Sequence, residues 1–569
     1  MGNTAAKTAL DRSAAAQPRS ALLPLVLGVT GHRDLCPEQK PELRRQVQQA
    51  LHVVQQQWTQ SQNGAGAPII LLSALAAGAD QLVAEVALDE GLQLTAILPM
   101  AVAEYEKDFG DPGELSSFHA LLQRAADVIT VPADASQRDL QYQAAGAYIS
   151  RHCYVLVALW DGIHLQQIGG TSHVVRMKLF GEAPDGPSDL PSLEPAASGP
   201  VCHIPTSRPN SPVEANSTVR ILRAAGAGKT VKSSALEQDL GIQSTLRKLG
   251  TFNSDWLAMA AGFHGRLYTA GGDLWTPSES FQNEEFLLYP CSIADAMASH
   301  FQVLSIRAIK CYFWLVLIAG MLRNFPPYRW VIAVSMVSLA AIWAIYLYAK
   351  HRDFHPRYHE YRALSEALRV QVFWRMAGLN ESVADHYLTN QSDDLGWICL
   401  ALRSVSLRLA APQTTDLLAV RQDWIDKQLA YYKKSVRKNS RYSNLLNRAG
   451  SATLFIAAPT AVLRLADASI SAHIGEIGRL LLQTLMKLLA STSTMALVFL
   501  GYNNIRGFKE HSKRHSAMIP LFEAASRYLA DAHTPEAAKQ MILQLGREAL
   551  AENGYWLVLH HQRKLDVPK

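Results

Sequence analysis

Two long apolar runs near the middle of the chain limit what it can fold into. Residues 311–349 contain only two charged side chains, Arg323 and Arg329, which lie on either side of a short proline-containing link. The second run, residues 330–348, is 19 residues long, enough for a helix to cross about 30 Å of hydrocarbon. The first run reaches a similar length if it begins near Val303. We therefore expect membrane spans at about 303–322 and 330–348, the alternative being a buried helical hairpin in a soluble domain.

A second pair of apolar runs follows towards the C-terminus. One contains Pro459 and Arg464, and the other carries a single charge, Lys487. We expect spans at about 449–465 and 480–502. Eight Lys and Arg residues lie in 421–448, between the two pairs. The positive-inside rule therefore predicts a multi-pass membrane protein with both termini in the cytoplasm.

The composition fits a chain that joins a soluble part to a membrane part. Hydrophobic residues make up 49% of the 569 residues, charged residues 18%, and the mean hydropathy is −0.00. These values exclude a mostly disordered chain, and they are low for a protein that is membrane-embedded throughout. A net charge of +5 does not indicate nucleic acid, so no direct nucleic-acid binding is expected. No CxxC pair occurs, which makes a zinc site or a disulfide framework improbable.

The N-terminal third alternates short apolar runs with amphipathic stretches. This alternation predicts an α/β fold with a doubly wound parallel sheet, followed by an all-α transmembrane half. We expect strands at residues 22–29, 68–75, 92–98, 127–131 and 154–160. Ligands of such folds bind at the carboxyl ends of the strands, so the loops there are the expected site.

These loops are rich in residues that suit a phosphate-bearing ligand. Glycines let backbone N–H groups approach an anion, Arg33 offers a planar fork, and the helix expected after Gly78 has an N-terminus that favours negative charge. A single glycine pair would more simply be a tight turn, but four such loops follow one another. The candidate ligand-binding residues are Gly28, Thr30, Gly31, Arg33, Ser73, Gly78, Asp80, Pro99, Glu104, Tyr105, Trp160, Asp161, Gly162, Gly169, Gly170 and Thr171. We expect no metal ligands and no resident cofactor.

As a set, these loops resemble the SLOG superfamily, which is related to the LOG nucleoside-phosphate enzymes and to ligand sensors of bacterial anti-phage systems. The resemblance covers about residues 22–180, in segments 28–33, 73–84, 98–109, 160–162 and 169–171. The C-terminal half is similar, more loosely, to SLATT two-helix membrane effectors, through Trp424, Tyr431, Tyr432, Glu552 and Trp556. The resemblance implies a sensor of a nucleotide- or NAD-derived signal that perturbs the inner membrane in abortive-infection defence, as a homo-oligomer in the lipid bilayer.

One difference from the LOG enzymes bears on catalysis. Their Pro-Gly-Gly-x-Gly-Thr-x-x-Glu motif carries a glutamate that supports glycosidic cleavage, and Val174 stands at that position here, with Ile168 in place of the proline. A valine can neither stabilise an oxocarbenium-like centre nor activate water. We therefore expect a sensor without catalytic residues. The alternative is a membrane-anchored N-glycosidase that processes nucleotides or NAD, with Glu104 or Asp161 supplying a carboxylate.

A channel or transporter with a regulatory domain is less favoured, because few charges lie within the apolar runs.

These interpretations divide the chain into five parts. The expected parts are a disordered tail (1–20), a SLOG-like domain (21–210), a helical coupling region (211–302), a first two-helix membrane segment with a cytosolic helix (303–400) and a second, SLATT-like one (401–569).

Overall fold

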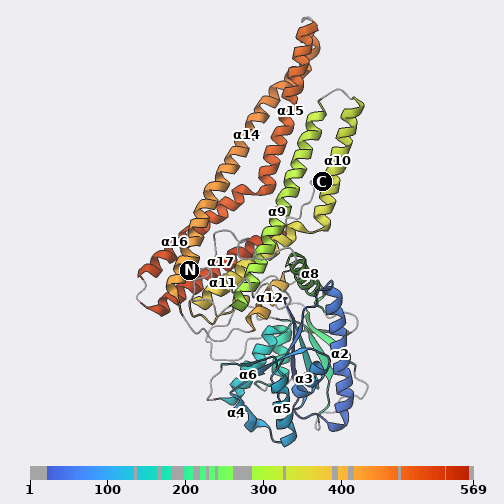
Figure 1. The fold of residues 1–569 in the computed structure, drawn as a ribbon, viewed down its shortest axis with the longest axis vertical. Coiled ribbons are helices and arrows are strands. Elements are labelled where there is room, and N and C mark those ends of the chain that lie inside the picture. Colours follow the sequence, from blue (N-terminus) through green and yellow to red (C-terminus); the bar gives the residue numbers. More distant parts are fainter. Residues whose placement is uncertain are drawn as a thin grey trace.

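A sheet domain and a long helical half make up the protein (Figure 1). The computed structural model describes residues 22–132, 137–163, 168–181, 198–208, 218–225, 230–236, 241–260, 285–324, 328–387, 395–407, 415–471, 476–531 and 534–562, without the side chains of 285–286, 460–471, 488 and 559–562. The tail expected at 1–20 lies outside these residues.

The N-terminal domain is built on a mixed, mainly parallel sheet. Its order is β4-β3-β2-β1-β5-β6-β7-β8, and neighbouring strands from β4 to β6 pair in parallel. Central strand β1 pairs with β2 on one side and with β5 on the other. The strands are β1 (Leu25–Gly31), β2 (Ile69–Ser73), β3 (Gln93–Leu98), β4 (Asp127–Thr130), β5 (Val155–Trp160), β6 (Val201–Pro205), β7 (Arg220–Ala225) and β8 (Thr230–Ala235). The five strands predicted from apolar runs are confirmed within a few residues.

The prediction of a wholly parallel sheet is wrong at one edge. Strands β7 and β8 run antiparallel to their neighbours, and they lie where the sequence predicted a helical coupling region. β8 is almost entirely exposed, and β7 is only partly buried. A half-solvated edge hairpin does not need the continuous apolar run that marks a buried parallel strand, so the pattern gave no strand signal there.

Helices cover both faces of the sheet, because strands up to β4 are added on one side of β1 and the strands after it on the other side. The segments before β4 are α2 (Lys40–Ser61), α3 (Ala79–Asp89), α4 (Val102–Tyr105) and α5 (Pro112–Arg124); those after it are α6 (Arg138–His152) and α7 (Thr171–Phe180). α3 packs on α2 and α5, whereas α6 packs on α7. The strand order reverses between β1 and β5, so the carboxyl ends of these two strands form the topological switch point where ligands of doubly wound folds bind.

The helical half extends away from the sheet domain as long helices (Figure 1). Its helices are α8 (Gln243–Ala260), α9 (Glu285–Leu322), α10 (Arg329–His351), α11 (Phe354–Met376), α12 (Gly396–Ser406), α14 (Lys427–Ser471), α15 (Glu476–Arg506), α16 (Phe508–Asp531) and α17 (Pro535–Gln562). Three helical segments among the described residues are long and apolar enough to cross a membrane: Leu287–Leu322, Arg329–Met376 and Glu476–Asp531. They contain three of the four predicted spans. The remaining one, 449–465, lies in α14, where the side chains from residue 460 on are outside the described set.

Large apolar side chains of these helices face outward. Trp343 in α10 is 61% exposed, and Leu480 in α15 is 68% exposed. Patches of this kind on a soluble protein mark an interaction surface. Here they occur on helices of spanning length and composition.

Helix α8 joins the sheet domain to the helical half. Asn253 accepts a hydrogen bond from the Leu23 N–H (2.9 Å) and donates to the Leu23 carbonyl and the Gln62 amide oxygen (both 3.0 Å). Asp255, on the same helix, accepts from Arg357 (2.8 Å) and Tyr361 (2.7 Å) of α11. The two parts therefore pack directly on each other through α8.

Candidate functional site

The end of β1 lies unusually close to the start of α3. A Cβ at Gly31 would lie 2.3 Å from the Ala79 Cβ, and one at Gly78, where φ is +82°, would lie 2.3 Å from the Arg33 carbonyl oxygen. Only glycine fits such contacts. The Ala79 N–H donates to the His32 carbonyl at 3.0 Å. The first backbone N–H of α3, which the sequence predicted would bind an anion, therefore already has an acceptor within the protein.

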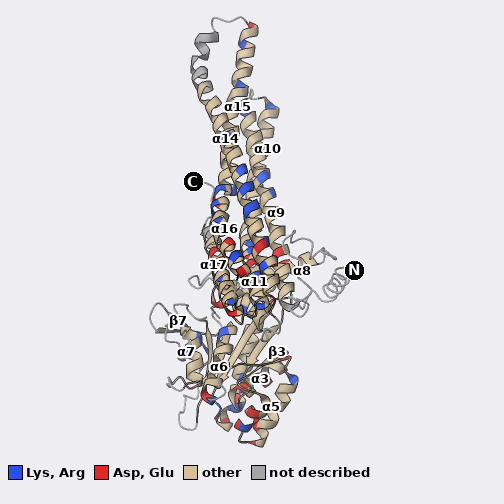
Figure 2. Cartoon of the chain, turned by 90° about the vertical axis from the view of Figure 1, so that its left-hand side faces the viewer, with Lys and Arg blue, Asp and Glu red and all other residues tan. Residues whose placement is uncertain are grey.

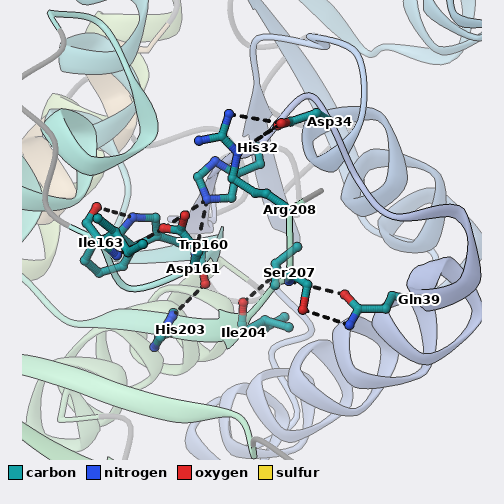
Figure 3. Close-up of polar contacts among 11 residues, drawn as sticks. His32, Asp34, Gln39, Trp160, Asp161, Ile163, His203, Ile204, Ser207 and Arg208 are labelled. Atoms are coloured by element: carbon teal, nitrogen blue, oxygen red, sulfur yellow. Dashed lines mark hydrogen bonds and ion pairs between the residues drawn. The ribbon is translucent and has the colours of Figure 1, made fainter. Parts of the chain in front are cut away.

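The switch point holds a buried histidine and carboxylate (Figure 3). His32 Nε2 accepts a hydrogen bond from the Asp161 N–H at 3.1 Å and lies 3.3 Å from Asp161 Oδ1. Burial lowers the pKa of His32, against the opposing effect of Asp161. Nε2 can accept a hydrogen bond from a backbone N–H only when the imidazole is neutral. The neutral His32 side chain therefore holds the end of β1 next to the loop after β5.

The residues predicted in the loop after β5 stabilise that loop. Asp161 Oδ1 accepts from the Ile163 N–H at 3.0 Å, and Trp160 Nε1 donates to the Ile163 carbonyl at 3.1 Å. Gly162 adopts a φ of +85° and faces open space. His32 was missing from the predicted site, although a polar side chain directly after a buried strand is a signal that could have found it.

A second set of hydrogen bonds crosses the sheet at the carboxyl ends of its strands. Arg208, just after β6, donates to both carboxylate oxygens of Asp34, at 3.1 and 3.0 Å, and Gln39 donates to Ser207 Oγ at 2.9 Å (Figure 3). These contacts hold the end of β6 beside the loop that follows β1. They fix the position of Arg33, which precedes Asp34.

Arg33 differs from the other cations nearby. Its guanidinium lies over the Tyr142 ring, 4.9 Å from the centroid. Arg138 is occupied by two carboxylates, since it donates to Glu104 at 2.8 Å and to Asp108 at 2.9 Å. Within the described part of the chain, no carboxylate lies within ion-pair distance of Arg33, which is exposed. Arg33 can therefore offer its donors to an anion.

Two buried acidic side chains lie beside Arg33. Asp80 is only 6% exposed, and this burial raises its pKa to about 7, while Arg33 and the backbone N–H groups of Ala76 and Ala74 oppose the shift. Tyr105 is fully buried, and its hydroxyl finds no hydrogen-bond partner among the described residues. Burial raises the Tyr105 pKa well above its ordinary value, and Asp80 raises it further. An unpartnered buried hydroxyl costs about 1–3 kcal/mol, which a ligand or water could relieve.

The loop before α7 approaches the same cluster. A Cβ at Gly169, where φ is +73°, would lie 3.2 Å from the Tyr142 Cβ. The Gly170 carbonyl accepts from the His173 N–H at 3.0 Å and the Val174 N–H at 3.2 Å, which starts α7 at Thr171. The residues between 163 and 168 are outside the described set.

Other predicted residues have packing or turn roles. Gly28 lies inside β1, where a Cβ would be 2.7 Å from Ile149 of α6. Ser73 is buried, and its hydroxyl accepts from the Leu75 N–H at 3.0 Å, in a turn where Leu75 has a φ of +56°. Thr30 pairs with Ala158 in the ladder, and Pro99 follows β3 directly. The structure thus brings Arg33, Asp80, Glu104 and Tyr105 together, but not these four.

The position of the missing LOG glutamate is part of the domain core. Val174 is buried, and a Cβ at Gly146 of α6 would lie 2.6 Å from Val174 Cγ2. A close apolar contact therefore occupies this position. Across the residues that the structure describes, no group of three or more His, Cys, Asp and Glu side chains could hold a metal ion.

Fold and site together define a doubly wound, mainly parallel sheet domain joined to a long apolar helical half. Comparisons with protein-family models, curated proteins and solved structures found no match to this chain.

Proposed function

We propose that this chain is a membrane-bound effector that senses a nucleotide- or NAD-derived signal through a SLOG-type domain and perturbs the bacterial inner membrane through SLATT-like helices. The observation that carries the proposal is the cluster at the switch point: an exposed Arg33 without an ion-pair partner in the described chain, a buried Asp80 and an unpartnered Tyr105 hydroxyl. A guanidinium binds phosphate oxygens in a planar, two-bond geometry. The anti-phage context rests on the resemblance alone.

Helix α6 offers a physical route from this site to the helical half. Near its start, Arg138 pairs with Glu104, and the Tyr142 ring lies against the Arg33 guanidinium of the switch-point cluster. Near its end, the Tyr148 hydroxyl donates to the Leu407 carbonyl at 3.2 Å, and Arg151 lies 3.5 Å from Asp385. The helix has 15 residues, a length of about 22 Å. A ligand that shifts Tyr142 would therefore act on contacts at the opposite end of a rigid element, which favours one arrangement of a self-associated assembly.

A membrane-anchored N-glycosidase is the second candidate. One observation favours it: a carboxyl such as Asp80, whose pKa is about 7, can donate a proton at neutral pH. The packing of Val174 where the LOG enzymes place their glutamate argues against it. Incubating the full chain with NAD and AMP separates the two, since released base would support the enzyme and binding without turnover the sensor.

Replacing Arg33 by glutamine tests the sensor site. The full-length protein in detergent should bind at least one of AMP, ADP-ribose, NAD or a cyclic dinucleotide, as measured by calorimetry. The variant should bind that compound roughly 10–100-fold more weakly, because charge-assisted hydrogen bonds contribute about 1.5–3 kcal/mol. Arg45→Gln is the matched control, since Arg45 is exposed and pairs with Glu42 on the outer side of α2. Equal affinities of the two variants, or no binding by the unaltered protein, would refute the site.

The proposed topology places the link between α9 and α10 on the outer side of the inner membrane. In a Cys311→Ser background, a cysteine introduced at the exposed Arg329 should react with a membrane-impermeant maleimide on intact spheroplasts. A cysteine introduced at Lys509, after the apolar part of α15, should react only after permeabilisation, because the positive-inside rule keeps that region in the cytoplasm. The opposite labelling pattern would reverse the orientation.

A further inference from the structure

A large cavity lies at the foot of the long helices, far from the switch point. Its volume is about 1120 Å3, and its walls come from α9, α11, α14, α16, α17 and the end of α15. Figure 2 shows Lys and Arg residues gathered where these long helices leave the helical body. The proposed signal site does not use this cavity.

The walls of the cavity carry an excess of positive charge. Seven Lys and Arg residues line it, against three glutamates. Glu366 is paired with Arg362 at 2.5 Å and with Arg369 at 2.8 Å, and Glu552 is paired with Arg514. Two of the three glutamates are therefore already neutralised, and only Glu510 remains without a described ion pair.

Three cations of the wall remain without a carboxylate partner among the described residues. Lys434 and Lys438 lie one turn apart on α14, and Arg506 is the last residue of α15. Arg506 Nε is buried and has no hydrogen-bond acceptor in the described part of the protein. Cations that line one cavity without a carboxylate partner, with a buried donor left open, favour an anion inside that cavity.

The level of the cavity along the helices narrows the chemistry of this anion. Ile306 and Ile309 of the wall directly precede the apolar part of α9, and Ile505 directly follows that of α15. The cavity therefore lies beside the ends of the most apolar stretches of α9 and α15, which we take as the level of the lipid headgroups. Basic residues at this level attract anionic lipids, by about 1 kcal/mol per Lys or Arg.

We propose that this cavity binds a phosphate-bearing anion through Lys434, Lys438 and Arg506, with apolar wall residues accepting the rest of the molecule. An anionic phospholipid headgroup and a soluble phosphate compound share this chemistry. The bound anion would join α14 to the end of α15, two helices that otherwise present like charges to each other there. This inference does not depend on the switch-point site, because it involves different residues in the other half of the chain.

The test uses the full-length protein in neutral detergent and two kinds of probe. Mixed micelles that contain phosphatidylglycerol, against phosphatidylcholine micelles, supply the headgroup; inorganic phosphate and AMP supply the soluble anion. The cavity variant replaces Lys434, Lys438 and Arg506 by glutamine. The control variant replaces Arg437, Lys509 and Lys513 by glutamine, which removes the same charges from exposed positions on α14 and α16 outside the cavity.

We expect the cavity variant to lose affinity for the bound probe by on the order of 100-fold, while the control stays within a few-fold of the unaltered protein. Binding of phosphatidylglycerol alone would assign a lipid headgroup, and binding of phosphate or AMP a soluble ligand. The proposal is overturned if neither probe binds the unaltered protein, or if both variants lose affinity equally. The proposal is also overturned if AMP binds through Arg33 and no probe depends on the cavity cations, an outcome that would leave the switch-point site intact.

Discussion

A single methyl group added at Gly250 is expected to destabilise the junction between the sheet domain and the helical half by roughly 3 kcal/mol. Gly250 lies inside α8, where a Cβ would be 1.9 Å from the Ser61 carbonyl oxygen and 2.6 Å from its carbon. Both atoms belong to the backbone at the end of α2, so no side chain can turn aside. Relief would require α8 to move away from α2, which would break the hydrogen bonds of Asn253 to Leu23 and Gln62.

Scanning fluorimetry of Gly250→Ala in detergent should show this loss as a melting temperature lower by on the order of 5–10 °C. Gly396→Ala is the matched control, because Gly396 also lies in a helix and nothing lies within 4 Å of the position of its added Cβ. The control should melt at or slightly above the temperature of the unaltered protein, since alanine favours helix. If the two variants melt together, α8 does not pack on α2 as described.

The sequence predicted the buried parts of the fold better than its edges. Parallel strands β1, β2, β3 and β5 are nearly continuous apolar runs, because helices cover both of their faces, and each such run marks a strand. β7 and β8 escaped because β8 is solvated along nearly its whole length. The junction at α8 was not predicted for another reason. Gly250 and Asn253 are small or polar residues, and their roles depend on which elements α8 packs against.

The sequence predicted which residues form the candidate site, but not which of them are neutralised by neighbouring side chains. Arg33 and Asp80 were identified because glycines and a helix start surround them at strand ends. The sequence could not show that Arg138 would neutralise Glu104 while leaving Arg33 without an ion pair among the described residues. The cationic cavity could not be predicted either, since Lys434 of α14 and Arg506 of α15 come to line one cavity only through tertiary packing.

The arrangement of the two halves determines how the proposed sensor would have to transmit its signal. The proposed site lies at the carboxyl ends of the strands, whereas the helical half packs at their amino ends, where Leu23 meets Asn253 and Tyr148 meets Leu407. The proposed signal would therefore have to cross the sheet domain. α6 and the strands are rigid elements that reach from one end to the other, so small shifts at Tyr142 can be transmitted without a hinge.

The second large effect expected is a pH dependence that Asp80 introduces. Burial raises its pKa from the usual 3.8 to about 7. Between these values the folded protein holds one more proton than the unfolded chain, so stability falls as pH rises from about 4 to about 7 and then stays constant. The full penalty above pH 7 is roughly 4 kcal/mol. Asp80→Asn, which is neutral throughout, should therefore be more stable than the unaltered protein at pH 8, and the difference should vanish near pH 4.

The same proton should control affinity for an anionic ligand. When Asp80 is protonated, its charge no longer repels an anion bound at Arg33, so binding of the nucleotide identified by calorimetry should be tighter at pH 6 than at pH 8. In Asp80→Asn the affinity should stay at its pH 6 level across this range. Asp89→Asn, which removes an exposed carboxylate from the far end of the same helix, should keep the pH dependence of the unaltered protein. A pH dependence that survives in Asp80→Asn would mean that another group titrates in the site, and Asp80 would then be a buried structural residue.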